Sequence, residues 1–466
     1  MPTAVPFRQA ADSCPGALQV HEAADGGLAR VRIPGGVVSL TQWNVLRSFA
    51  PLELTSRGNL QIRGVTDSSA LADRLADVGL LPSATHERVR NIVASPLGGV
   101  FGVVDALDRA LCGSLELAEL PGRFLFAIDT DRDVISLGAD VTVLLGSDTV
   151  PVLLAGVDSG LRVRPDQAVP ALIAAARCFL AERAAQASKA WRLSELDDAV
   201  PRVASRMHES LACARIEPSA PESPSPPAST PLGVVAVAPH PAGAGAPHAD
   251  GAGAPHADGA GAPHADGAGA PHADDAGAPH AGARDVGVAV GVPLGRLSGA
   301  QMDVIAAVAR EEIIVTPWRG VVLPRADPMA LATLADAGLI TDPASPWASA
   351  SACTGLPGCA KSRADVRADA AVALGLGLGL AQRAPTGQRP VSTRPAAAHP
   401  DTAHPGTAHG RTVLPVHFVG CERRCGHPAG VHVDVLATAD GYQVDGEQVT
   451  VDELPAAVAA ARRTNR

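Results

Sequence analysis

The sequence lacks three features that would place it in common functional classes. It has no apolar run near the roughly 20 residues of a membrane span, and its start, MPTAVPFRQAADSCPG, lacks the basic-then-apolar order of a signal peptide. Positive charge is not in excess, since 38 Lys and Arg are outnumbered by 48 Asp and Glu, giving a net charge of −10. This balance argues against a general nucleic-acid or membrane-surface binder. We expect a cytoplasmic protein with no nucleic-acid or membrane partner, in which any cationic site is local.

Cysteine is also scarce, with 8 in 466 residues, too few for a disulfide scaffold. Four of them are scattered singly, as small buried hydrophobic residues often are: Cys14, Cys112, Cys178 and Cys213. The others form two close pairs in the last quarter of the chain: Cys353 with Cys359, and Cys421 with Cys425. Paired thiols at short spacing indicate a metal or cluster site.

Two segments of the chain, 27–65 and 286–324, read alike. Pro34 matches Pro293 at an offset of 259 residues, and LADVGL at 75–80 matches LADAGL at 334–339 at the same offset. Each segment predicts a strand, a turn, a helix, a second strand (LQIRGV or GVVLP) and a second helix. The repeat predicts an α+β fold of two related halves around a pseudo-two-fold axis, with the ligand at their junction.

Caps and β-rich runs refine this prediction. Ser39 and Ser298 are suited to begin the first helix of each half, and Gly79 and Gly338 to end the second. Further strands are expected in FLFAID (124–129) and VISLGADVTVLL (134–145), and in the later runs VLPVHFVG and GVHVDVLAT.

Two tracts of low complexity interrupt the chain. The first is rich in Pro and Ser and then repeats GAGAPHAD, which brings a histidine every eight residues; the second begins at LGLGLGL. The histidines could chelate a metal, but a unit without apolar anchors favours a flexible linker. The predicted parts are a first half (1–216), a disordered linker (217–283), a second half-domain with the first cysteine pair (284–373), a low-complexity insertion (374–411), and a C-terminal part with the second pair (412–466).

The cysteine pairs have a specific spacing. They read C-x5-C in ACTGLPGCAKSR, then a gap of 61 residues, then C-x3-C in GCERRCGHP. Four thiolates suit either a tetrahedral zinc ion or a 4Fe-4S cluster. Structural zinc usually takes C-x2-C to C-x4-C, a range that the C-x5-C pair exceeds. The combination of C-x5-C with C-x3-C resembles the arrangement in the sulfite and nitrite reductase superfamily, which implies a cluster with Cys353, Cys359, Cys421 and Cys425 as its ligands.

These motifs resemble the sulfite and nitrite reductase superfamily. LTSRGNLQIRGV is similar to the arginine-rich strand motif of that superfamily, and the repeat to its duplicated halves. DSCPGAL, RVRIPGG, TPWRGVVLP, ACTGLPGCAKSRADVRADA and GCERRCGHP together resemble its precorrin-3B synthase branch. The resemblance implies a 4Fe-4S cluster on the four paired cysteines and, in the siroheme enzymes, a bridge from the Cys425 position to the macrocycle iron.

The resemblance also implies roles for arginines. Arg57 matches an arginine that contacts the bound anion, Arg90 a second such position, and Arg123 the first of two proton-delivering lysines. Leu125 stands at the second lysine position, and neither residue is a good proton donor. This departure weakens the interpretation as a six-electron reductase.

An anionic tetrapyrrole would need local hydrogen-bond donors. Even spacing on a predicted strand puts four side chains on one face as a candidate substrate platform: Arg57, Asn59, Gln61 and Arg63. Further candidates for substrate binding are Arg319 and Lys361. His427, just after the last cysteine, could be an acid, a ligand of a mononuclear non-haem iron, or a hydrogen-bonded neighbour of the cluster, of which the last is favoured.

The implied activity is an NADH- and O2-dependent monooxygenase that converts precorrin-3A to precorrin-3B in aerobic cobalamin synthesis. No G-x-G-x-x-G lies in a strand–turn–helix context, so electrons are expected from a separate donor or reductase. One alternative is a sulfite or nitrite reductase that carries siroheme. Another is a metal-handling protein that acts through its His-containing octapeptides on a degenerate reductase fold.

Overall fold

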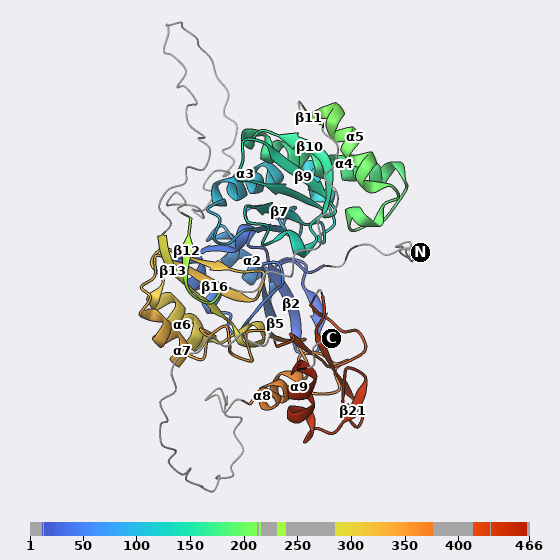
Figure 1. The fold of residues 1–466 in the computed structure, drawn as a ribbon. Coiled ribbons are helices and arrows are strands. Elements are labelled where there is room, and N and C mark those ends of the chain that lie inside the picture. The colour runs from blue at the N-terminus through green and yellow to red at the C-terminus, as the bar shows by residue number, and fades with distance from the viewer. Residues whose placement is uncertain are drawn as a thin grey trace, which may run out of the picture. The chain divides into compact units, whose positions relative to one another are not determined.

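The computed structural model of the 466-residue chain describes residues 12, 14–211, 214–215, 231–238, 285–375, 413–428 and 430–463 (Figure 1). The chain divides into two compact units, Met1–Ala348 and Ser349–Arg466, which we call the N-terminal and C-terminal units. The GAGAPHAD repeats and nearly all of the predicted insertion 374–411 lie outside the described residues. The C-terminal unit begins inside the predicted part 284–373 and contains both cysteine pairs.

Two five-stranded sheets of the N-terminal unit have the same design. The first has the order β1 (His21–Ala23), β2 (Gly26–Val31), β5 (Leu60–Val65), β4 (Leu52–Leu54), β14 (Arg296–Leu297). The second has the order β12 (Gly233–Val237), β13 (Asp285–Gly291), β16 (Gly320–Pro324), β15 (Glu312–Val315), β3 (Val37–Ser39). Each sheet therefore takes its last strand from the other segment of the repeat.

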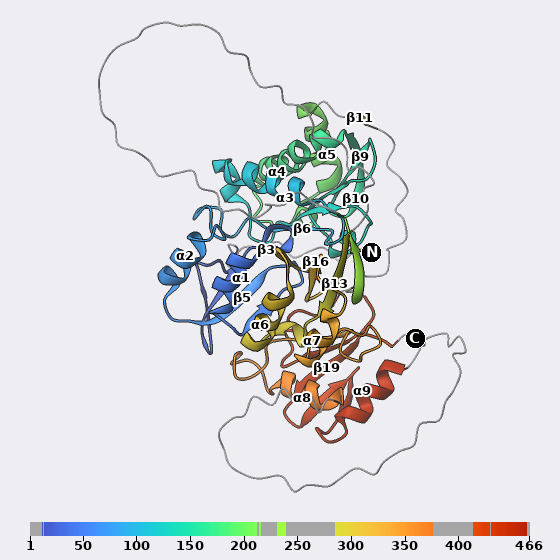
Figure 2. The same cartoon turned by 90° about the vertical axis from the view of Figure 1, so that its left-hand side faces the viewer.

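The helices of the two repeat segments begin at the predicted residues. Ser39 caps α1 (Leu40–Arg47) and Ser298 caps α6 (Gly299–Val308), each through a complete capping box. Helices α1 and α6 pack against each other (Figure 2), and the Trp43 Nε1–H donates to the Met302 carbonyl at 3.0 Å. The strands β5 and β16 coincide with the predicted LQIRGV and GVVLP.

The second helix of each segment ends as its sequence predicts. Helix α2 spans Ser68–Ala76 and α7 spans Ala330–Asp336. Gly79 and Gly338 follow with φ of +74° and +81°, a left-handed conformation that glycine adopts without steric cost. After each glycine, a backbone N–H of Leu80 or Leu339 returns to a carbonyl in the last turn, at 2.9 and 3.0 Å.

A six-stranded sheet forms the remainder of the N-terminal unit. Its order is β11 (Ala214–Arg215), β10 (Val157–Val163), β9 (Val150–Leu154), β8 (Val141–Leu144), β7 (Phe126–Asp129), β6 (Ile92–Ala94). Strands β6, β7 and β8 are parallel. Helices α3 (Phe101–Cys112), α4 (Ala168–Ala185) and α5 (Ala199–Ser210) share a large hydrophobic core with this sheet. Strand β7 confirms the strand expected in 124–129, whereas the run 134–145 yields only β8, because Ile135–Leu137 forms a 3-10 turn that ends at Gly138.

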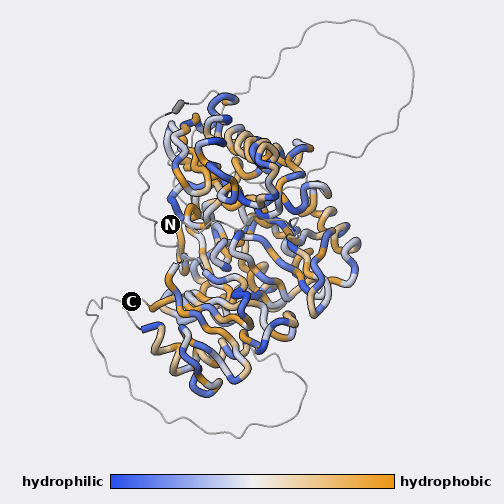
Figure 3. Tube along the Cα trace, turned by 90° about the vertical axis from the view of Figure 1, so that its right-hand side faces the viewer, coloured by the Kyte–Doolittle hydropathy of each residue, from blue (hydrophilic) through white to orange (hydrophobic). Residues whose placement is uncertain are grey.

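The C-terminal unit is a smaller α/β layer. Its sheet has the order β17 (Ala350–Ala352), β18 (Val416–Val419), β19 (Val433–Thr438), β20 (Gly441–Val444), β21 (Glu447–Val449). Strands β17, β18 and β19 are parallel, and helices α8 (Val366–Ala373) and α9 (Leu454–Arg463) contact each other. Strands β18 and β19 confirm the two strands predicted after residue 412. Hydrophobic and hydrophilic residues are interspersed along the trace of the described residues (Figure 3).

One prediction about the linker was wrong. Strand β12 lies inside the range 217–283 and pairs with β13 along its full length. Its residues, GVVAV, are β-branched or small, which suits a strand. The strand was not predicted because a Pro- and Ser-rich segment precedes it. Among the described helices none has the length and apolar character that crossing a membrane requires.

Candidate functional site

Five arginines of the N-terminal unit form the first candidate site, which we call the arginine site: Arg30, Arg32, Arg57, Arg123 and Arg192. They come from five places in the sequence: β2, the residue after it, the turn before β5, the segment before β7, and the loop between α4 and α5. The sheets thus bring together cations that are up to 162 residues apart.

The charges of the arginine site oppose one another. Burial, together with repulsion by Arg30 and Arg57, lowers the pKa of Arg32 to about 9. Burial and repulsion by Arg192 lower the pKa of Arg57 to about 10, and burial also lowers that of Arg30, with Arg123 adding repulsion. Guanidinium groups held in this way gain from a bound anion, which restores the solvation and charge balance that they have lost.

Arg32 is the most deeply placed member. It is 2% exposed, and its Nε and Nη2 donate to the carbonyls of Arg88 and Gly122, each at 3.1 Å. Its Nη1 and the Nε of Arg30 are buried and have no hydrogen-bond partner among the described residues. Buried donors without partners are costly, so these atoms favour a ligand that supplies acceptors.

The N-terminal segment brings a thiol and a carboxylate to this site. The buried Glu87 carboxylate accepts the N–H groups of Ala17, Leu18 and Gln19 at 2.7, 2.7 and 3.1 Å, which anchors the segment. Cys14 and Asp12 lie close enough to raise the pKa values of Arg30 and Arg32, opposing the effect of burial. Together they offset only part of the positive charge.

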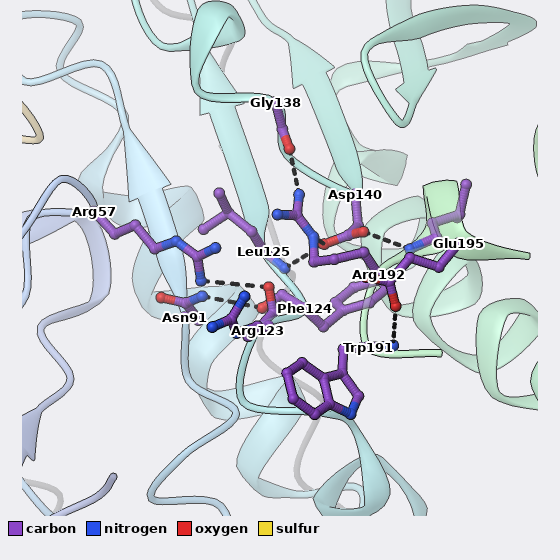
Figure 4. Close-up of polar contacts among 11 residues, drawn as sticks. Arg57, Asn91, Arg123, Phe124, Leu125, Gly138, Asp140, Trp191, Arg192 and Glu195 are labelled. Atoms are coloured by element: carbon purple, nitrogen blue, oxygen red, sulfur yellow. Dashed lines mark hydrogen bonds and ion pairs between the residues drawn. The ribbon is translucent and has the colours of Figure 1, made fainter. Parts of the chain in front are cut away.

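Figure 4 shows three members of the arginine site, of which Arg123 is exposed and Arg57 and Arg192 are half-buried. Arg57 lies in the turn before β5, and its Nη1 donates to the Arg123 carbonyl at 3.3 Å. The Arg123 guanidinium lies over the Trp191 ring, with its carbon 5.1 Å from the ring centroid. An aromatic face and several cations thus meet at one place, which suits a flat ligand that carries carboxylates.

Leu125, at the second lysine position of the reductase motif, belongs to a small hydrophobic cluster. It is 1% exposed and clusters with Val93, Ala127, Val134 and Ala139, against which Trp318 packs. No proton could be delivered from such a side chain, and an ammonium group at this place would be buried among apolar side chains.

Two predicted site residues turn out to support the fold. Arg90 is 4% exposed and forms a bidentate ion pair with Asp108, with N–O distances of 2.8 and 2.6 Å. Asn59 is 1% exposed; its Oδ1 accepts the Ile33 N–H and its Nδ2 donates to Asn91. Both side chains are buried, and their polar groups bond to other residues of the protein. We therefore assign Arg90 and Asn59 to the core, in place of the predicted roles in anion binding and substrate binding.

The prediction that Arg57 and Arg63 share one face of a strand was also wrong. Strand β5 begins only at Leu60, so Arg57 lies in the turn before it. Arg63 forms a bidentate ion pair with Asp25, both N–O distances being 2.8 Å, so it is not a member of the arginine site. Gln61 is half-buried and lies directly across from Arg30 on β2, which keeps it next to the site.

The other predicted substrate-binding residues lie elsewhere. Arg319, with φ of +60°, is part of the turn between β15 and β16, and its stem packs closely against Gly295. Lys361 is exposed and follows Cys359 in the C-terminal unit. Neither is a member of the arginine site.

The cysteine site lies entirely in the C-terminal unit. Cys353 and Cys359 follow β17, and Cys421 and Cys425 follow β18. Because β17 and β18 are parallel neighbours, their carboxyl ends lie at one edge of the sheet, and the two loops start side by side. The Arg363 N–H donates to the Gly420 carbonyl at 2.9 Å, which joins the loops.

Backbone groups surround the first cysteine. The Cys353 Sγ accepts the Gly420 N–H at 3.3 Å. Burial raises the pKa of Cys353, N–H groups of Gly420 and Gly355 oppose that rise, and Cys425 and Cys359 are near enough to add to it. Gly420 is required here, since a Cβ atom would lie 1.8 Å from the Ser362 Oγ.

A buried histidine supports the second cysteine loop. His417 on β18 is fully buried; its Nδ1 lies 2.8 Å from the Ser351 Oγ and its Nε2 donates to the Cys425 carbonyl at 3.1 Å. His427 is exposed, donates from Nδ1 to the neighbouring Pro428 carbonyl at 3.0 Å and stacks on His432. Of these two, His417 is the one that positions a cysteine.

The cysteine site has features that would suit an iron–sulfur cluster. Within the described ranges, no three His, Cys, Asp or Glu side chains lie close enough together to hold one metal ion. A cluster binds each thiolate to a different iron and so tolerates wider separation than one tetrahedral ion does. Two adjoining loops with four thiols, and backbone N–H groups directed at sulfur, match its needs.

Comparison with known proteins supports the fold. No family model matches the sequence, and no curated protein matches it significantly. Among solved structures 26 chains match, including the Mycobacterium tuberculosis NirA protein, at 19% identity and a TM-score of 0.60, over 97% of this chain and 83% of that chain. The chain therefore shares the mixed α+β fold of the NirA protein.

Sequence reasoning missed Arg30, Arg32, Trp191 and Arg192. Arg30 and Arg32 lie in RVRIPGG, and alternation along β2 indicates that they share a face. The signal for the other two was weak: a Trp-Arg pair in a chain that has only 4 Trp. Their place at the site depends on how a loop packs against a distant strand.

Proposed function

We propose that this chain is a cytoplasmic iron–sulfur monooxygenase of the precorrin-3B synthase type, which oxidises precorrin-3A with O2 and reducing equivalents from NADH. The observation that carries the proposal is the burial of Leu125 in an apolar cluster, within a fold of the reductase type. The arginine site and the cysteine site supply the two other parts that the reaction needs.

The arginine site would bind the substrate. Precorrins carry several carboxylates around a large ring, and arginine suits carboxylates through its paired N–H donors. Arg57, Arg123 and Arg192 would meet these groups at the exposed part of the site, with Arg30 and Arg32 deeper. Gln61 would add a neutral hydrogen bond.

The region around Leu125 supports oxygenation over six-electron reduction. Reduction of sulfite or nitrite to the end product needs repeated proton delivery beside the bound anion. Here Arg123 keeps a charge but rarely releases a proton, and Leu125 offers none. Incorporation of one oxygen atom into the substrate needs fewer protons, because only the second oxygen atom leaves as water, with two electrons and two protons from the donor.

The cysteine site would hold a 4Fe-4S cluster on Cys353, Cys359, Cys421 and Cys425. When bound, such a cluster supplies single-electron transfer. The protein would orient the loops through His417 and the Gly420 N–H, and would accept electrons from a separate donor. Within the described residues no three His, Cys, Asp or Glu side chains lie close enough together to hold a mononuclear iron, so the site of such an iron stays a prediction. We also infer that the two sheets with exchanged strands arose by duplication.

A siroheme-dependent sulfite or nitrite reductase is the second candidate, favoured by the likeness to the NirA protein. The arginine site would suit the carboxylates of siroheme as well as those of a precorrin. The assignment of the GAGAPHAD histidines to metal handling has no support among the described residues, since those repeats lie outside them.

Reductase assays with an artificial electron donor separate the two candidates. We expect the purified protein to show cluster absorption without Soret-like bands and to reduce sulfite and nitrite poorly. Precorrin-3A should instead cause O2 consumption. Siroheme bands together with rapid reduction of either anion would contradict the proposal and favour the second candidate.

A further inference from the structure

One buried carboxylate, that of Asp140, joins two segments of the arginine site. Asp140 precedes β8 and is 1% exposed. Its Oδ2 accepts the Leu125 N–H at 2.8 Å and the Arg192 Nε–H at 2.7 Å, and its Oδ1 accepts the Leu193 N–H at 2.6 Å (Figure 4). The two segments that meet here are 67 residues apart, from Leu125 to Arg192.

The loop that Asp140 holds is itself well defined. It covers residues 186–198, between α4 and α5. At its base Gln186 and Asp197 exchange two hydrogen bonds of 2.9 and 3.0 Å, and near its tip the Trp191 N–H donates to the Glu195 carboxylate at 2.8 Å. The Leu193 side chain is fully buried. The loop thus has an internal shape that docks as one piece.

The hydrogen bonds between this loop and Asp140 determine the positions of two side chains, those of Trp191 and Arg192. Arg192 is fixed by the Asp140 carboxylate and by the Gly138 carbonyl. Trp191, next to it, presents its ring to the Arg123 guanidinium. Arg123 is only two residues from Leu125, whose backbone bonds to the same carboxylate. Asp140 therefore sets the separation between the loop and the Arg123 segment.

The charge balance agrees with this arrangement. Asp140 attracts Arg57 while Arg192 repels it, so the carboxylate makes it less costly to place another cation close by. Loss of the carboxylate would leave Arg192 without its anionic partner and the Leu125 and Leu193 N–H groups with weaker acceptors.

We propose that Asp140 is a positioning residue of the arginine site, and that the Trp191–Arg192 loop it holds is a specificity element for a flat ligand bearing several carboxylates. This inference rests on the proposed function as far as the substrate is a tetrapyrrole. It goes further by assigning recognition to a loop that no sequence motif marks.

The test uses the full-length protein and uroporphyrin I, a planar ring with several carboxylates, as the probe. Affinity is measured by titration of the porphyrin absorption band, and docking of the loop by hydrogen exchange over 186–198. Asp140→Asn should weaken binding about tenfold and speed exchange in the loop, because an amide accepts weakly and carries no charge. Asp108→Asn is the matched control, since Asp108 is another buried carboxylate paired with an arginine, Arg90. It should leave porphyrin affinity within about twofold of the wild type.

A second pair of variants guards against misfolding of the first. Trp191→Ala and Arg192→Gln each remove one loop group, and each should weaken porphyrin binding while leaving exchange in the sheet core unchanged. Inorganic sulfate serves as a small anion that cannot contact the whole site, and its binding should depend less on Trp191. Wild-type affinity in all three variants, or no porphyrin binding by the wild type, would overturn the inference. Loop-dependent porphyrin binding without any oxygenase activity would leave the inference intact and contradict the proposed function.

Discussion

The arginine site and the cysteine site are built in opposite ways. The cysteines come from two loops that leave neighbouring parallel strands, and two short motifs contain all of them. The five arginines come from four separate segments, and cross-sheet packing and one buried carboxylate bring them together. The first site depends on local spacing and the second on the tertiary fold. One substitution at the cysteine site should therefore abolish its function, whereas each substitution at the arginine site should only weaken substrate binding.

The largest effect is expected at the cysteine site. Cys425→Ser should abolish both the cluster and turnover, because a serine hydroxyl is a poor replacement for a thiolate ligand. Iron and acid-labile sulfide content measures the first loss directly. Cys178→Ser is the control, since Cys178 is buried in helix α4 of the N-terminal unit, and it should keep its full iron content. Full iron and sulfide in the Cys425 variant would disprove the ligand assignment.

A smaller, graded effect is expected at the arginine site. Under the proposed function, Arg57→Ala would remove one charge-assisted bond to a substrate carboxylate, of about 1.5–3 kcal/mol, and should raise KM roughly ten- to hundredfold. Arg63→Ala lies on the adjacent strand but loses only its ion pair with Asp25, so KM should be almost unchanged. Steady-state kinetics on both variants compares them. Equal increases in KM would show that β5, and not the turn before it, faces the substrate.

The smallest effect concerns stability and involves neither site. Ser95 Oγ lies 3.0 Å from an Asp129 oxygen and 2.5 Å from an Asp133 oxygen, although it can donate only one hydrogen. Burial, together with the charges of Asp129 and Asp131, raises the pKa of Asp133 to about 6. The folded state therefore binds a proton on the Asp133 carboxyl group more tightly than the unfolded state does. The stability that this proton provides is lost as pH rises from about 4 to about 6.

Asp133→Asn should remove this dependence. At pH 7 the variant should be more stable than the wild type by about 1–2 kcal/mol, a value reduced for the partial exposure of the carboxyl group. At pH 4 the two proteins should be nearly equal. Denaturant unfolding at both pH values measures the difference, and a variant that is less stable than the wild type at pH 7 would contradict the raised pKa of Asp133.

The sequence could predict those parts of the fold that local chemistry determines. Both Ser caps, both Gly ends and the strands β5 and β16 were placed correctly, because capping and alternation are properties of a few adjacent residues. Strand β12 was not predicted because low-complexity sequence lies on both sides of it. The exchange of β3 and β14 between the sheets could not be predicted, since two-residue and three-residue strands have almost no pattern of their own.

The candidate site was predicted unevenly for the same reason. Spacing alone grouped the four cysteines, which the fold places on two adjoining loops. Arginine carries no comparable signal, because the sequence does not distinguish an arginine that pairs with a carboxylate from one that binds a ligand. Arg90 and Arg63 proved to be of the first kind, and Arg32 has a buried, unpartnered nitrogen that indicates the second.

Labelling with isotopic O2 tests the central claim most directly. The full-length protein would be incubated with precorrin-3A, an electron donor and 18O2, and the tetrapyrrole examined by mass spectrometry. The proposed function predicts a product that contains one labelled oxygen atom, with the second atom released as labelled water. An unlabelled tetrapyrrole, together with efficient reduction of sulfite or nitrite by the same preparation, would contradict it.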